Sequence, residues 1–476
     1  MPGGLSASVR DNLQRRANGA DDAPVAVAVS GGGDSLALLL IAHRWASVAG
    51  RPLLALTVDH GLNPASADWC AFVAERAARL GVAHRTLRWA GDKPAAGLPA
   101  AARAARHALL ADAAREAGAA VILMGHTADD VAEAAAMRAA GALVATPREW
   151  APSPAWPQGR GVFLLRPLLG VRRADLRTWL AERGETWIDD PANDDPRFAR
   201  SRARRTLSGA APTAATQSRQ LSCSALASVR EGRAGEFTLP RQLAADGRLL
   251  SALLLCAAGG ATPPRGRRLA ALQARLAGAS DVTSTLAGAR IEARGERLLI
   301  CREAGEFARR DQGVGFVNMA TAGRSGPRPP RGEGAGDGGA SSAPVVRAPA
   351  GMRPVRTPTP DPSPQGGGEA EEPLGEVVFD GRLLIEGAPA ADVQPLAGLA
   401  ARLSATEQAA LKAIPAAARG ALPAIVSPSG AVSCPMLGQE GSARAVPLGL
   451  ARLHAALGAV ESEAAIWRVA KSQPRP

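Results

Sequence analysis

The feature that most constrains the fold is a pattern repeated between residues 24 and about 140, in which a short apolar run precedes a longer stretch of helical periodicity. The apolar runs predict strands at Val25–Val29, Leu53–Val58, Ala83–Trp89 and Ala120–Met124, and the longer stretches predict helices near 35–48, 66–80, 99–117 and 128–140. Strands that alternate with helices of this length favour an α/β fold with a doubly wound parallel sheet.

The residues directly after the predicted strands mark the expected site, because ligands of such sheets bind at the carboxyl ends of the strands. The residues selected by this rule are Ser30–Ser35, Asp59, His60, Gly125, His126, Asp129 and Asp130. We therefore predict that these mostly polar residues meet at one edge of the sheet.

The sequence SGGGDS, Ser30–Ser35, joins the first predicted strand to the first predicted helix. Such a junction is a seat for phosphate, because unpaired backbone N–H groups and the positive end of the helix dipole meet there. The loop lacks the Lys-Ser/Thr pair of a Walker loop and does not follow the Gly-x-Gly-x-x-Gly pattern. Asp34 would repel a bare phosphate, so it indicates Mg²⁺ between a carboxylate and a pyrophosphate. A tight glycine turn is the structural alternative.

Beyond residue 164 the patterns change. An amphipathic helix is predicted from about 171 to 183, followed by a Trp-Ile-Asp-Asp-Pro loop and the basic segment RFARSRARR. Residues 206 to about 320 are predicted to be mainly helical, ending in a hairpin around Gly295. Further on, GEVVFDGRLLIEG has strand-like alternation, and Leu403–Ile414 predicts a helix.

These patterns divide the 476-residue chain into four parts. Residues 1–205 are the expected catalytic domain, and 206–320 a mostly helical middle domain. Residues 321–373 are rich in Gly, Pro, Ser and Ala and cannot bury enough apolar surface to offset their ordering entropy, which predicts a disordered linker. Residues 374–476 are the expected small α+β C-terminal domain.

The net charge and the distribution of cysteines limit the class of binding partner and the cellular compartment that we expect. The net charge of +12 favours a polyanionic partner, although a merely basic protein would have the same charge. The 5 cysteines are far apart and form no Cys-x-x-Cys pair, so we expect reduced thiols in a cytoplasmic protein without a zinc site. The sequence has no apolar signal region and no run of 18 apolar residues, so we expect no membrane contact.

The loop SGGGDS resembles the SGGxDS pyrophosphate loop, or PP-loop, of the N-type ATP pyrophosphatases, whose fold is Rossmann-like. Within that superfamily the further motifs resemble the tRNA(Ile)-lysidine synthetases. These motifs are TVDHGLNPAS (57–66), AARAARHALL (101–110), GHTADDVAEAAAMR (125–138), RPLLGVRRADL (166–176) and WIDDPANDDPRFARSRAR (187–204). The resemblance is strong over about 24–205, faint in the middle and moderate near the C-terminus.

The resemblance implies a ligase that joins L-lysine to C2 of the wobble cytidine in the CAU anticodon of isoleucine tRNA. ATP would adenylate the cytidine with release of pyrophosphate, and lysine would then displace AMP. ATP and Mg²⁺ are the implied cofactors, the middle and C-terminal domains are the implied tRNA contacts, and the family resemblance suggests a homodimer.

The resemblance also assigns roles at the first two strand ends. Ser30, Gly31, Gly32, Gly33 and Ser35 would hold the pyrophosphate, and Asp34 would bind Mg²⁺. Asp59 and His60 match the nucleotide-side motif of the family, although an Asp that caps a turn is an equally ordinary explanation.

Four side chains near the start of the fourth predicted helix share one face by their spacing. They are His126, Asp129, Asp130 and Glu133, at i, i+3, i+4 and i+7. The resemblance implies that this face holds the cationic groups of lysine and orders Mg²⁺-ATP. An N-terminal helix cap would explain Asp129 or Asp130 alone, but not the whole set.

Arginines supply the remaining candidates. Arg103 and Arg106 lie one turn apart, where at least one could clamp a carboxylate or the α-phosphate, although lone surface arginines would look the same. The resemblance implies that Arg202 and Arg204, with Arg205 beside them, meet the adenylated cytidine or the tRNA backbone, while a solvated basic helix end is the alternative. The expected catalytic residues are Asp34, Asp130 and Arg106.

The sequence departs from the family pattern at several positions. Val131 stands where the family usually has Gln, His107 where it has Tyr, and Ser201 where it has Asn. The glycine- and serine-rich loop expected just past Arg138 is replaced by AAGALVATPREWAPSPAWPQGRG. These changes affect how lysine and cytidine would be enclosed, and leave the ATP loop intact.

Two other functions compete with this hypothesis. A tRNA 2-thiolating enzyme of the same superfamily would need a catalytic cysteine or a Cys-x-x-Cys cluster near the pocket, which the sequence lacks. A non-catalytic tRNA-binding protein could keep the fold and the arginines. The presence of Asp34 and Asp130 favours the enzyme, because a pocket without catalysis has no need of these carboxylates.

Overall fold

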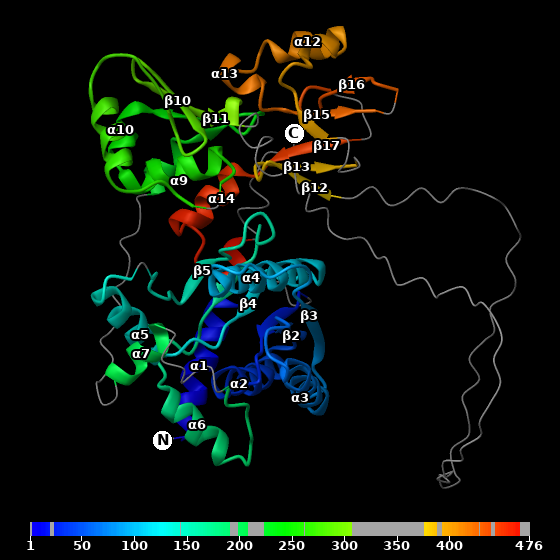
Figure 1. Cartoon of the computed structure of the whole chain (residues 1–476), viewed down its shortest axis with the longest axis vertical. Coiled ribbons are helices and arrows are strands. Elements are labelled where there is room, and N and C mark those ends of the chain that lie inside the picture. Colours follow the sequence, from blue (N-terminus) through cyan, green and yellow to red (C-terminus); the bar gives the residue numbers. More distant parts are fainter. Residues whose placement is uncertain are drawn as a thin grey trace, which may run out of the picture.

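The architecture was obtained as a computed structural model of the chain, shown in Figure 1. The structure describes residues 2–19, 23–142, 144–190, 199–207, 223–260, 262–306, 376–387, 393–427, 429–438 and 443–466. The expected linker at 321–373 therefore lies outside the described residues. Within the described ranges, no helix has both the length and the apolar character needed to cross a bilayer.

The N-terminal unit is built on a six-stranded sheet in the order β3-β2-β1-β4-β6-β5. Its strands are β1 (Val25–Ala28), β2 (Leu53–Asp59), β3 (Ala83–Arg88), β4 (Val121–Leu123), β5 (Trp150–Pro152) and β6 (Phe163–Leu165). All neighbours pair in parallel except β5 and β6, so the predicted doubly wound α/β fold is confirmed. The order reverses between β1 and β4, and this point is where a doubly wound sheet binds its ligands.

Helices cover both faces of this sheet because neighbouring residues of each strand point to opposite faces. Val25 and Val27 of β1 pack in one core with α1, α2, α3 and α6, whereas Ala26 packs with α4 in the other. The helices are α1 (Pro2–Arg16), α2 (Gly33–Ala49), α3 (Ser66–Arg79), α4 (Leu98–Glu116), α5 (Ala128–Ala139), α6 (Arg173–Ala181) and α7 (Ala199–Thr206). The helices predicted near 35–48, 66–80, 99–117, 128–140 and 171–183 are confirmed.

The middle unit corrects one prediction, because it is mixed α/β in content rather than mostly helical. A five-stranded sheet, β7-β8-β11-β10-β9, packs against α9 and α10. Its elements are α8 (Cys223–Ala227), β7 (Arg230–Glu231), β8 (Phe237–Pro240), the 3₁₀ helix η2 (Arg241–Ala245), α9 (Gly247–Ala257), α10 (Arg267–Ala277), β9 (Val282–Leu286), β10 (Ala289–Arg294) and β11 (Arg297–Arg302). The strands are short, so the Leu-rich helices dominate the sequence pattern. The hairpin around Gly295 is confirmed, with Arg294 opposite Arg297.

The C-terminal unit contains two three-stranded sheets, β12-β13-β17 and β14-β15-β16. Its elements are β12 (Glu376–Phe379), β13 (Leu383–Glu386), β14 (Val393–Pro395), η4 (Ala400–Arg402), α12 (Ala405–Leu411), α13 (Ala416–Arg419), β15 (Pro423–Val426), β16 (Val432–Ser433) and β17 (Arg444–Pro447). The predicted strands around 376–386 and the predicted helix at Leu403–Ile414 are confirmed. The α12 helix starts with a capping box, in which Ser404 and Glu407 bond each other's backbone N–H.

The last helix, α14 (Gly449–Leu457), packs away from the two small sheets. Leu453 and Leu457 belong to the core of the middle unit, and Figure 1 shows α14 beside α9. After this helix the chain returns to the N-terminal unit, where Trp150 donates to the carbonyl of Val460 at 2.9 Å. The domain boundaries drawn from the sequence remain a prediction, but the middle and C-terminal segments share this core.

Candidate active site

The glycine-rich loop lies at the carboxyl end of β1 and runs into α2. The Ser35 hydroxyl accepts from the backbone N–H of Ser30 at 3.2 Å and donates to the carbonyl of Gly32 at 2.9 Å. The hydroxyls of Ser30 and Ser35 are also 3.2 Å apart. Ser35 is buried, so its side chain holds the loop closed from within. The two serines that the sequence predicts as phosphate ligands therefore also fix the shape of the loop.

The Trp-Ile-Asp-Asp segment packs directly over this loop. Gly31 has a φ of +87°, and a Cβ there would lie 2.4 Å from Cδ1 of Ile188. The Ile188 N–H donates to the carbonyl of Gly31 at 3.0 Å, and the Trp187 ring lies beside Gly33. A side chain at position 31 would both strain the backbone and push this segment away, so glycine is required there.

Asp34 is the first residue of the loop to face the neighbouring strand ends. Its Oδ2 accepts from Nε of Arg173, at the start of α6, at 3.0 Å. Its Oδ1 is buried and has no hydrogen-bond partner in the described part of the chain. Burial raises the pKa of Asp34, and Arg173 opposes that shift. One carboxylate oxygen thus remains available to a cation.

The start of α5 brings two more carboxylates to the same place. Asp130 accepts from both the N–H and the hydroxyl of Thr127, at 2.8 and 3.0 Å, and so caps the helix. Burial would raise the pKa of Asp130, but the Thr127 N–H and the nearby cations hold it below its usual value. Asp129 accepts from the backbone N–H of Arg173, the first residue of α6, at 2.8 Å. Asp130 therefore has the capping role that the sequence left open, whereas Asp129 caps a different helix, which the sequence did not predict.

Glu133 lies one turn further along α5 and is only 1% exposed. Its Oε1 accepts from Nη1 of Arg173 at 3.1 Å and from Nε of Arg204 at 2.9 Å. Its Oε2 lies 3.3 Å from Nε of Arg200. Arg200 and Arg204 are one turn apart on α7, which places both on the face that meets Glu133, whereas Arg202 is exposed. Of the predicted pair, Arg204 reaches the carboxylates directly.

A second group of cations lies next to these carboxylates, on α4 and at the end of β6. In the described part of the chain Arg103, Arg106 and Arg166 form no ion pair with a carboxylate. Burial, together with Arg103 and other like charges, lowers the pKa of Arg106 and of Arg166 to about 10 each. Arg106 is half-buried with its Nε buried and without a hydrogen-bond partner in the described chain, and Arg166 is buried. Cations that lack carboxylate partners favour an anionic ligand, which is consistent with the expected role of Arg106.

Two of the predicted nucleotide-side residues differ in what they contact. Asp59, at the end of β2, accepts from the N–H of Gly61 at 2.8 Å, and this bond lowers its pKa. It therefore caps its own turn, the alternative that the sequence left open. His60 lies edge-on to Trp89 with its Nδ1 buried and without a hydrogen-bond partner in the described chain. His126 follows β4, and its Nδ1 is buried and without such a partner as well.

The residues present fit Mg²⁺ held together with a nucleotide. Across the described ranges, no group of three or more His, Cys, Asp and Glu residues could hold a metal by itself. Mg²⁺ usually takes one or two carboxylates and completes its shell with phosphate oxygens and water. Asp34 offers one buried oxygen for that purpose, next to a loop of N–H groups that suits phosphate.

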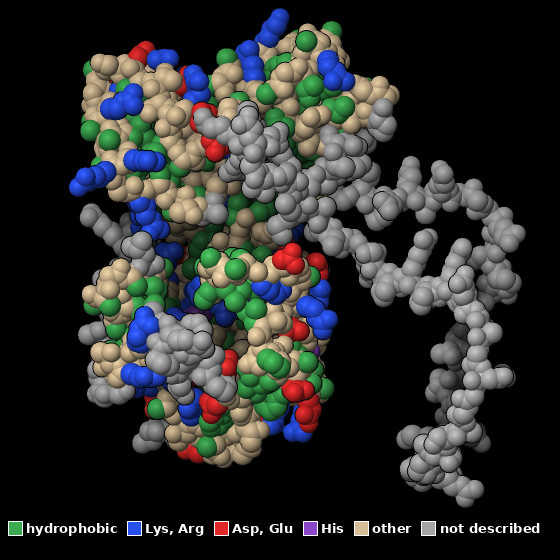
Figure 2. Space-filling view, viewed as in Figure 1, with side chains coloured by type: hydrophobic (Ala, Val, Ile, Leu, Met, Phe, Trp, Pro, Cys, Tyr) green, Lys and Arg blue, Asp and Glu red, His purple; other side chains and the backbone are tan. Residues whose placement is uncertain are grey.

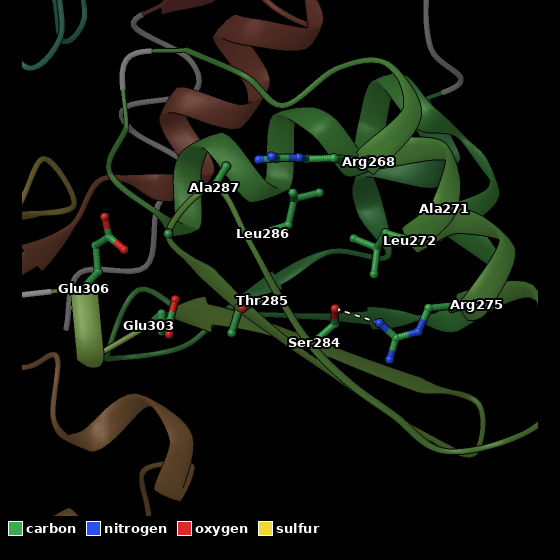
Figure 3. A pocket seen from close by; sticks show the side chains of 11 residues that line it. Arg268, Ala271, Leu272, Arg275, Ser284, Thr285, Leu286, Ala287, Glu303 and Glu306 are labelled. Atoms are coloured by element: carbon green, nitrogen blue, oxygen red, sulfur yellow. Dashed lines mark hydrogen bonds between the residues drawn. The ribbon is translucent and has the colours of Figure 1, made fainter. Parts of the chain in front are cut away.

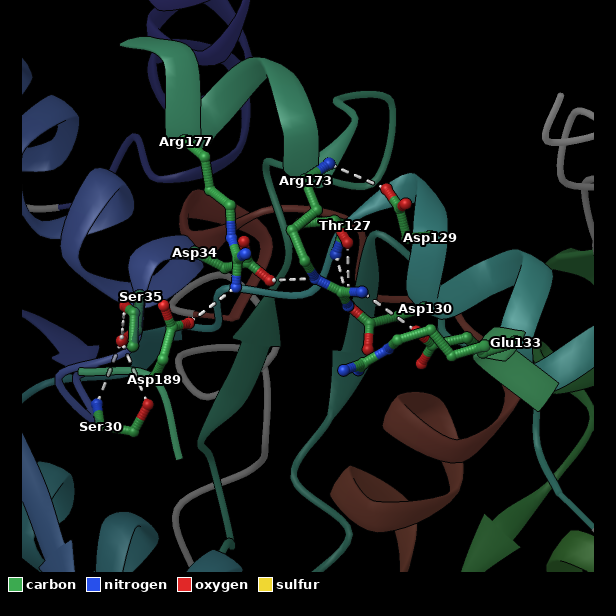
Figure 4. A network of polar contacts seen from close by, with 12 residues as sticks. Ser30, Asp34, Ser35, Thr127, Asp129, Asp130, Glu133, Arg173, Arg177 and Asp189 are labelled. Carbon is green, nitrogen blue, oxygen red and sulfur yellow. Dashed lines mark hydrogen bonds and ion pairs between the residues drawn. The ribbon is translucent and has the colours of Figure 1, made fainter. Parts of the chain in front are cut away.

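The structure thus brings most of the predicted site together and adds residues that the sequence did not single out. Figure 4 shows Asp34, Asp129, Asp130 and Glu133 converging on Arg173. Arg173 lies inside the quoted motif RPLLGVRRADL, but nothing in the sequence distinguished it from Arg172, which is exposed. Arg177 and Asp189, paired at 2.8 Å, fix the segment over the loop and were also not predicted.

The comparisons with known sequences agree on one family. A model described as a PP-loop domain matches residues 5–211. A tRNA(Ile)-lysidine synthase of Caulobacter vibrioides is 52% identical over 310 residues, covering 63% of this chain and 72% of the relative. The chain belongs to the tRNA(Ile)-lysidine synthase family.

Further relatives extend this comparison. A tRNA(Ile)-lysidine synthase of Hyphomonas neptunium is 42% identical over 308 residues, covering 60% of this chain and 83% of the relative. Among solved structures, the U34-tRNA thiolase NcsA of Methanococcus maripaludis, with its [4Fe-4S] cluster, matches with 19% identity and a TM-score of 0.35, covering 43% of this chain and 72% of that chain.

The segment that departs from the family pattern just past Arg138 forms the edge of the sheet. It supplies β5, and Trp150 stacks on Phe163 with ring centroids 5.1 Å apart. Trp156 donates to the carbonyl of Gly381 at 2.6 Å, and its ring lies 4.1 Å from the Arg452 guanidinium. The segment therefore joins the N-terminal unit to both units above it, a role that only the fold reveals.

The replacement of the family's usual Tyr by His107 predicts a pH-dependent stability. His107 is 3% exposed, and neither ring nitrogen has a hydrogen-bond partner among the described residues. Burial, with Arg106, Arg103 and Arg166 adding to it, lowers the pKa of His107 from 6.5 to about 3. Between these values the unfolded chain binds more protons than the folded protein, so stability falls as the pH falls below 6.5.

We therefore expect the His107→Phe variant to lose part of this dependence. One such histidine lowers the free energy of unfolding of the wild type by about 1.4 kcal/mol at pH 5.5 relative to neutral pH. Urea denaturation at pH 7.5 and 5.5 measures the difference, with His43→Phe, on α2, as the control substitution. An equal pH dependence of the wild type and His107→Phe would contradict the prediction.

Proposed function

We propose that this chain is an ATP-dependent ligase that joins L-lysine to C2 of the wobble cytidine of isoleucine tRNA with a CAU anticodon. The single observation that carries the proposal is the position of the Ser30–Ser35 loop opposite the carboxylates of α5, at the point where the strand order reverses. Membership of the tRNA(Ile)-lysidine synthase family supports the substrates.

The reaction needs two displacements in one site. The O2 atom of the cytidine attacks the α-phosphorus of ATP, and the bond to the β-phosphate oxygen breaks to release pyrophosphate. The ε-amine of lysine then attacks C2 and loses a proton, and the C2–O bond breaks to release AMP. Mg²⁺, when bound, would neutralise the charge of the leaving pyrophosphate.

Each group of residues has a part in this scheme. The N–H groups and hydroxyls of Ser30–Ser35 bind the pyrophosphate, and the free oxygen of Asp34 holds Mg²⁺. Asp130 and Glu133 attract the cationic groups of lysine. Arg106, with Arg103 beside it, offers a half-buried positive charge to the α-phosphate. Asp129 contributes indirectly, because it caps the start of α6.

A lysine incorporation assay tests the proposal directly. The full chain is incubated with ATP, Mg²⁺, radiolabelled lysine and an isoleucine tRNA transcript with a CAU anticodon. We expect label in the tRNA, together with one AMP released per lysine incorporated. A transcript with guanosine at the wobble position is the control. Absence of label, under conditions in which a relative of the family is active, would reject the function.

The thiolating alternative is disfavoured by the cysteines. Cys70, Cys256, Cys301 and Cys434 are free and buried, and burial raises the pKa of Cys256, Cys301 and Cys434 to about 12 each. These thiols therefore stay protonated and unreactive. Cys223 lies where the side chain is not described.

The tRNA would also contact the middle unit. The surface hollow between the N-terminal unit and the units above it carries Lys and Arg side chains (Figure 2). On the middle unit itself, a groove of about 580 Å³ between α10 and β9 has Arg268 and Arg275 on one wall and Glu303 and Glu306 at its end (Figure 3). Because the groove carries both charges, we place the RNA along the exposed arginines that begin α10, at the rim of the groove and not inside it.

This placement predicts a change in the salt dependence of tRNA binding. Arg267 and Arg268 are exposed at the N-terminus of α10, where the helix dipole adds positive potential. Replacing both with Gln should weaken tRNA binding and lower the slope of log K against log salt by about 1 to 2. Filter binding at several salt concentrations measures it, with Arg79→Gln on α3 as the control. An unchanged slope would place the RNA elsewhere.

A further inference from the structure

Arg173 connects the proposed metal ligand to the proposed lysine subsite. Its Nε lies 3.0 Å from Oδ2 of Asp34, and its Nη1 lies 3.1 Å from Oε1 of Glu133. Its Nη2 lies 3.7 Å from Oδ2 of Asp130. Figure 4 shows the side chain reaching from α6 between the two groups of carboxylates. These carboxylates, opposing the effect of burial, raise the pKa of Arg173, so it carries its charge permanently.

Three guanidinium groups surround Glu133 in this arrangement. Its Oε1 accepts hydrogen bonds from Arg173 and Arg204, and its Oε2 lies 3.3 Å from Nε of Arg200 but has no hydrogen-bond partner among the described residues. The Oδ2 atom of Asp130 accepts the two hydrogen bonds from Thr127 that cap α5. An incoming ammonium group would therefore be repelled by the three guanidinium groups that already surround Glu133. It could bind well there only after one of the three guanidinium groups had left.

Arg173 is the guanidinium that a nucleotide would move. Arg200 and Arg204 pair with carboxylates of α5, whereas Arg173 pairs both with these carboxylates and with Asp34 beside the glycine-rich loop. A triphosphate in that loop is a stronger partner for a guanidinium than a shared carboxylate. A divalent cation on the free oxygen of Asp34 would also repel Arg173 from the other oxygen.

We propose that Arg173 makes lysine binding depend on prior binding of Mg²⁺-ATP. Without nucleotide, its guanidinium occupies the position of the lysine ammonium group at Glu133. With nucleotide, it turns to the phosphates and frees that carboxylate. The inference rests on the proposed function, because it assumes that lysine and ATP share this site. Binding is reciprocal, so lysine must strengthen nucleotide binding by the same factor.

Equilibrium dialysis of radiolabelled lysine against the full chain tests the coupling without turnover. The dissociation constant is measured with Mg²⁺ in the absence of tRNA, with and without α,β-methylene ATP. For the wild type we expect the nucleotide to tighten lysine binding at least about tenfold, within the usual range of such couplings. In Arg173→Gln, lysine binding without nucleotide should tighten, and the nucleotide effect should fall below about threefold.

Two further variants complete the design. Arg172→Gln, at the exposed neighbouring position, should keep the wild-type ratio. Arg173→Lys keeps the charge but lacks the planar fork that bridges Asp34 and Glu133, so its ratio should fall between those of the wild type and Arg173→Gln. If Arg173→Gln fails to show a cooperative melting transition, Arg173→Lys replaces it as the variant that tests the coupling.

The possible results distinguish a failure of this inference from a failure of the proposed function on which it rests. A wild type that binds lysine equally with and without nucleotide, or an Arg173→Gln variant that keeps the wild-type ratio, overturns the role of Arg173. Neither result argues against the proposed incorporation of lysine into tRNA. Failure of the wild type to bind lysine under any condition and to incorporate it into tRNA overturns the proposed function itself.

Discussion

Asp34→Asn is expected to lower ATP-dependent AMP release by about 10³-fold or more, the largest effect of any single substitution in the site. Asn keeps the size of the side chain and one acceptor oxygen, but it replaces the other oxygen with an NH₂ donor and removes the negative charge that would hold Mg²⁺. Because burial raises the pKa of Asp34, the folded protein disfavours that charge. Its removal should therefore leave the melting temperature unchanged or slightly higher.

Single-turnover release of labelled AMP measures the effect, with tRNA affinity determined in parallel. We expect tRNA binding to stay within about twofold of the wild type, because phosphate contacts by arginines dominate RNA affinity. Asp68→Asn, at an exposed position in the first turn of α3, is the matched control. Loss of tRNA binding in Asp34→Asn, or AMP release near the wild-type rate, would show that Asp34 has been placed wrongly.

Glu463→Ala is expected to reduce the free energy of unfolding by about 3–5 kcal/mol. Glu463 is fully buried and accepts from Nη1 and Nη2 of Arg51 at 3.2 and 3.0 Å, and from the N–H of Gly19 at 2.9 Å. Removing it leaves the Arg51 guanidinium buried with only the carbonyls of Ala17 and Ala23 as partners in the described chain. An unpaired buried charge is among the costliest defects of a folded protein.

Differential scanning calorimetry should show the transition of the N-terminal unit lowered by roughly 6–20 °C. Glu461→Ala, two positions away and exposed, is the matched control. The double variant Arg51→Met with Glu463→Leu should recover much of the loss, because an apolar pair of similar volume often replaces a buried ion pair. A melting temperature unchanged in Glu463→Ala would mean that the C-terminal segment does not hold the N-terminal unit.

The predictable part of the site is the part encoded locally. The Ser30–Ser35 loop and the face formed by Asp129, Asp130 and Glu133 follow from a strand-to-helix junction and from helical spacing. Both are short-range rules, and the structure places the two groups together at the reversal of the strand order. The assignment of these residues to ATP, Mg²⁺ and lysine remains a proposal.

The middle unit shows where local patterns mislead. The segment ARIEAR of β10 buries Ala289, Ile291 and Ala293 on one face and carries charged side chains on the other. Its hairpin partner β11 was predicted, whereas β9, which joins β10 across a short turn, was not, and β8 pairs with β11 only through contacts between segments distant in the sequence. The Leu-rich helices α9 and α10 have the stronger periodicity, so a helical prediction prevailed over these short strands.

By itself the sequence determined the α/β fold of the N-terminal unit, the glycine-rich loop at its first strand-to-helix junction and the family, because periodicity and motifs act within a few tens of residues. Only the tertiary structure decided that Arg173 joins Asp34 to Glu133, that Ile188 closes over Gly31, and that Glu463 pairs with Arg51. The residues of each of these pairs lie between 40 and 412 positions apart. Their contact depends on how whole elements pack, which no local pattern records.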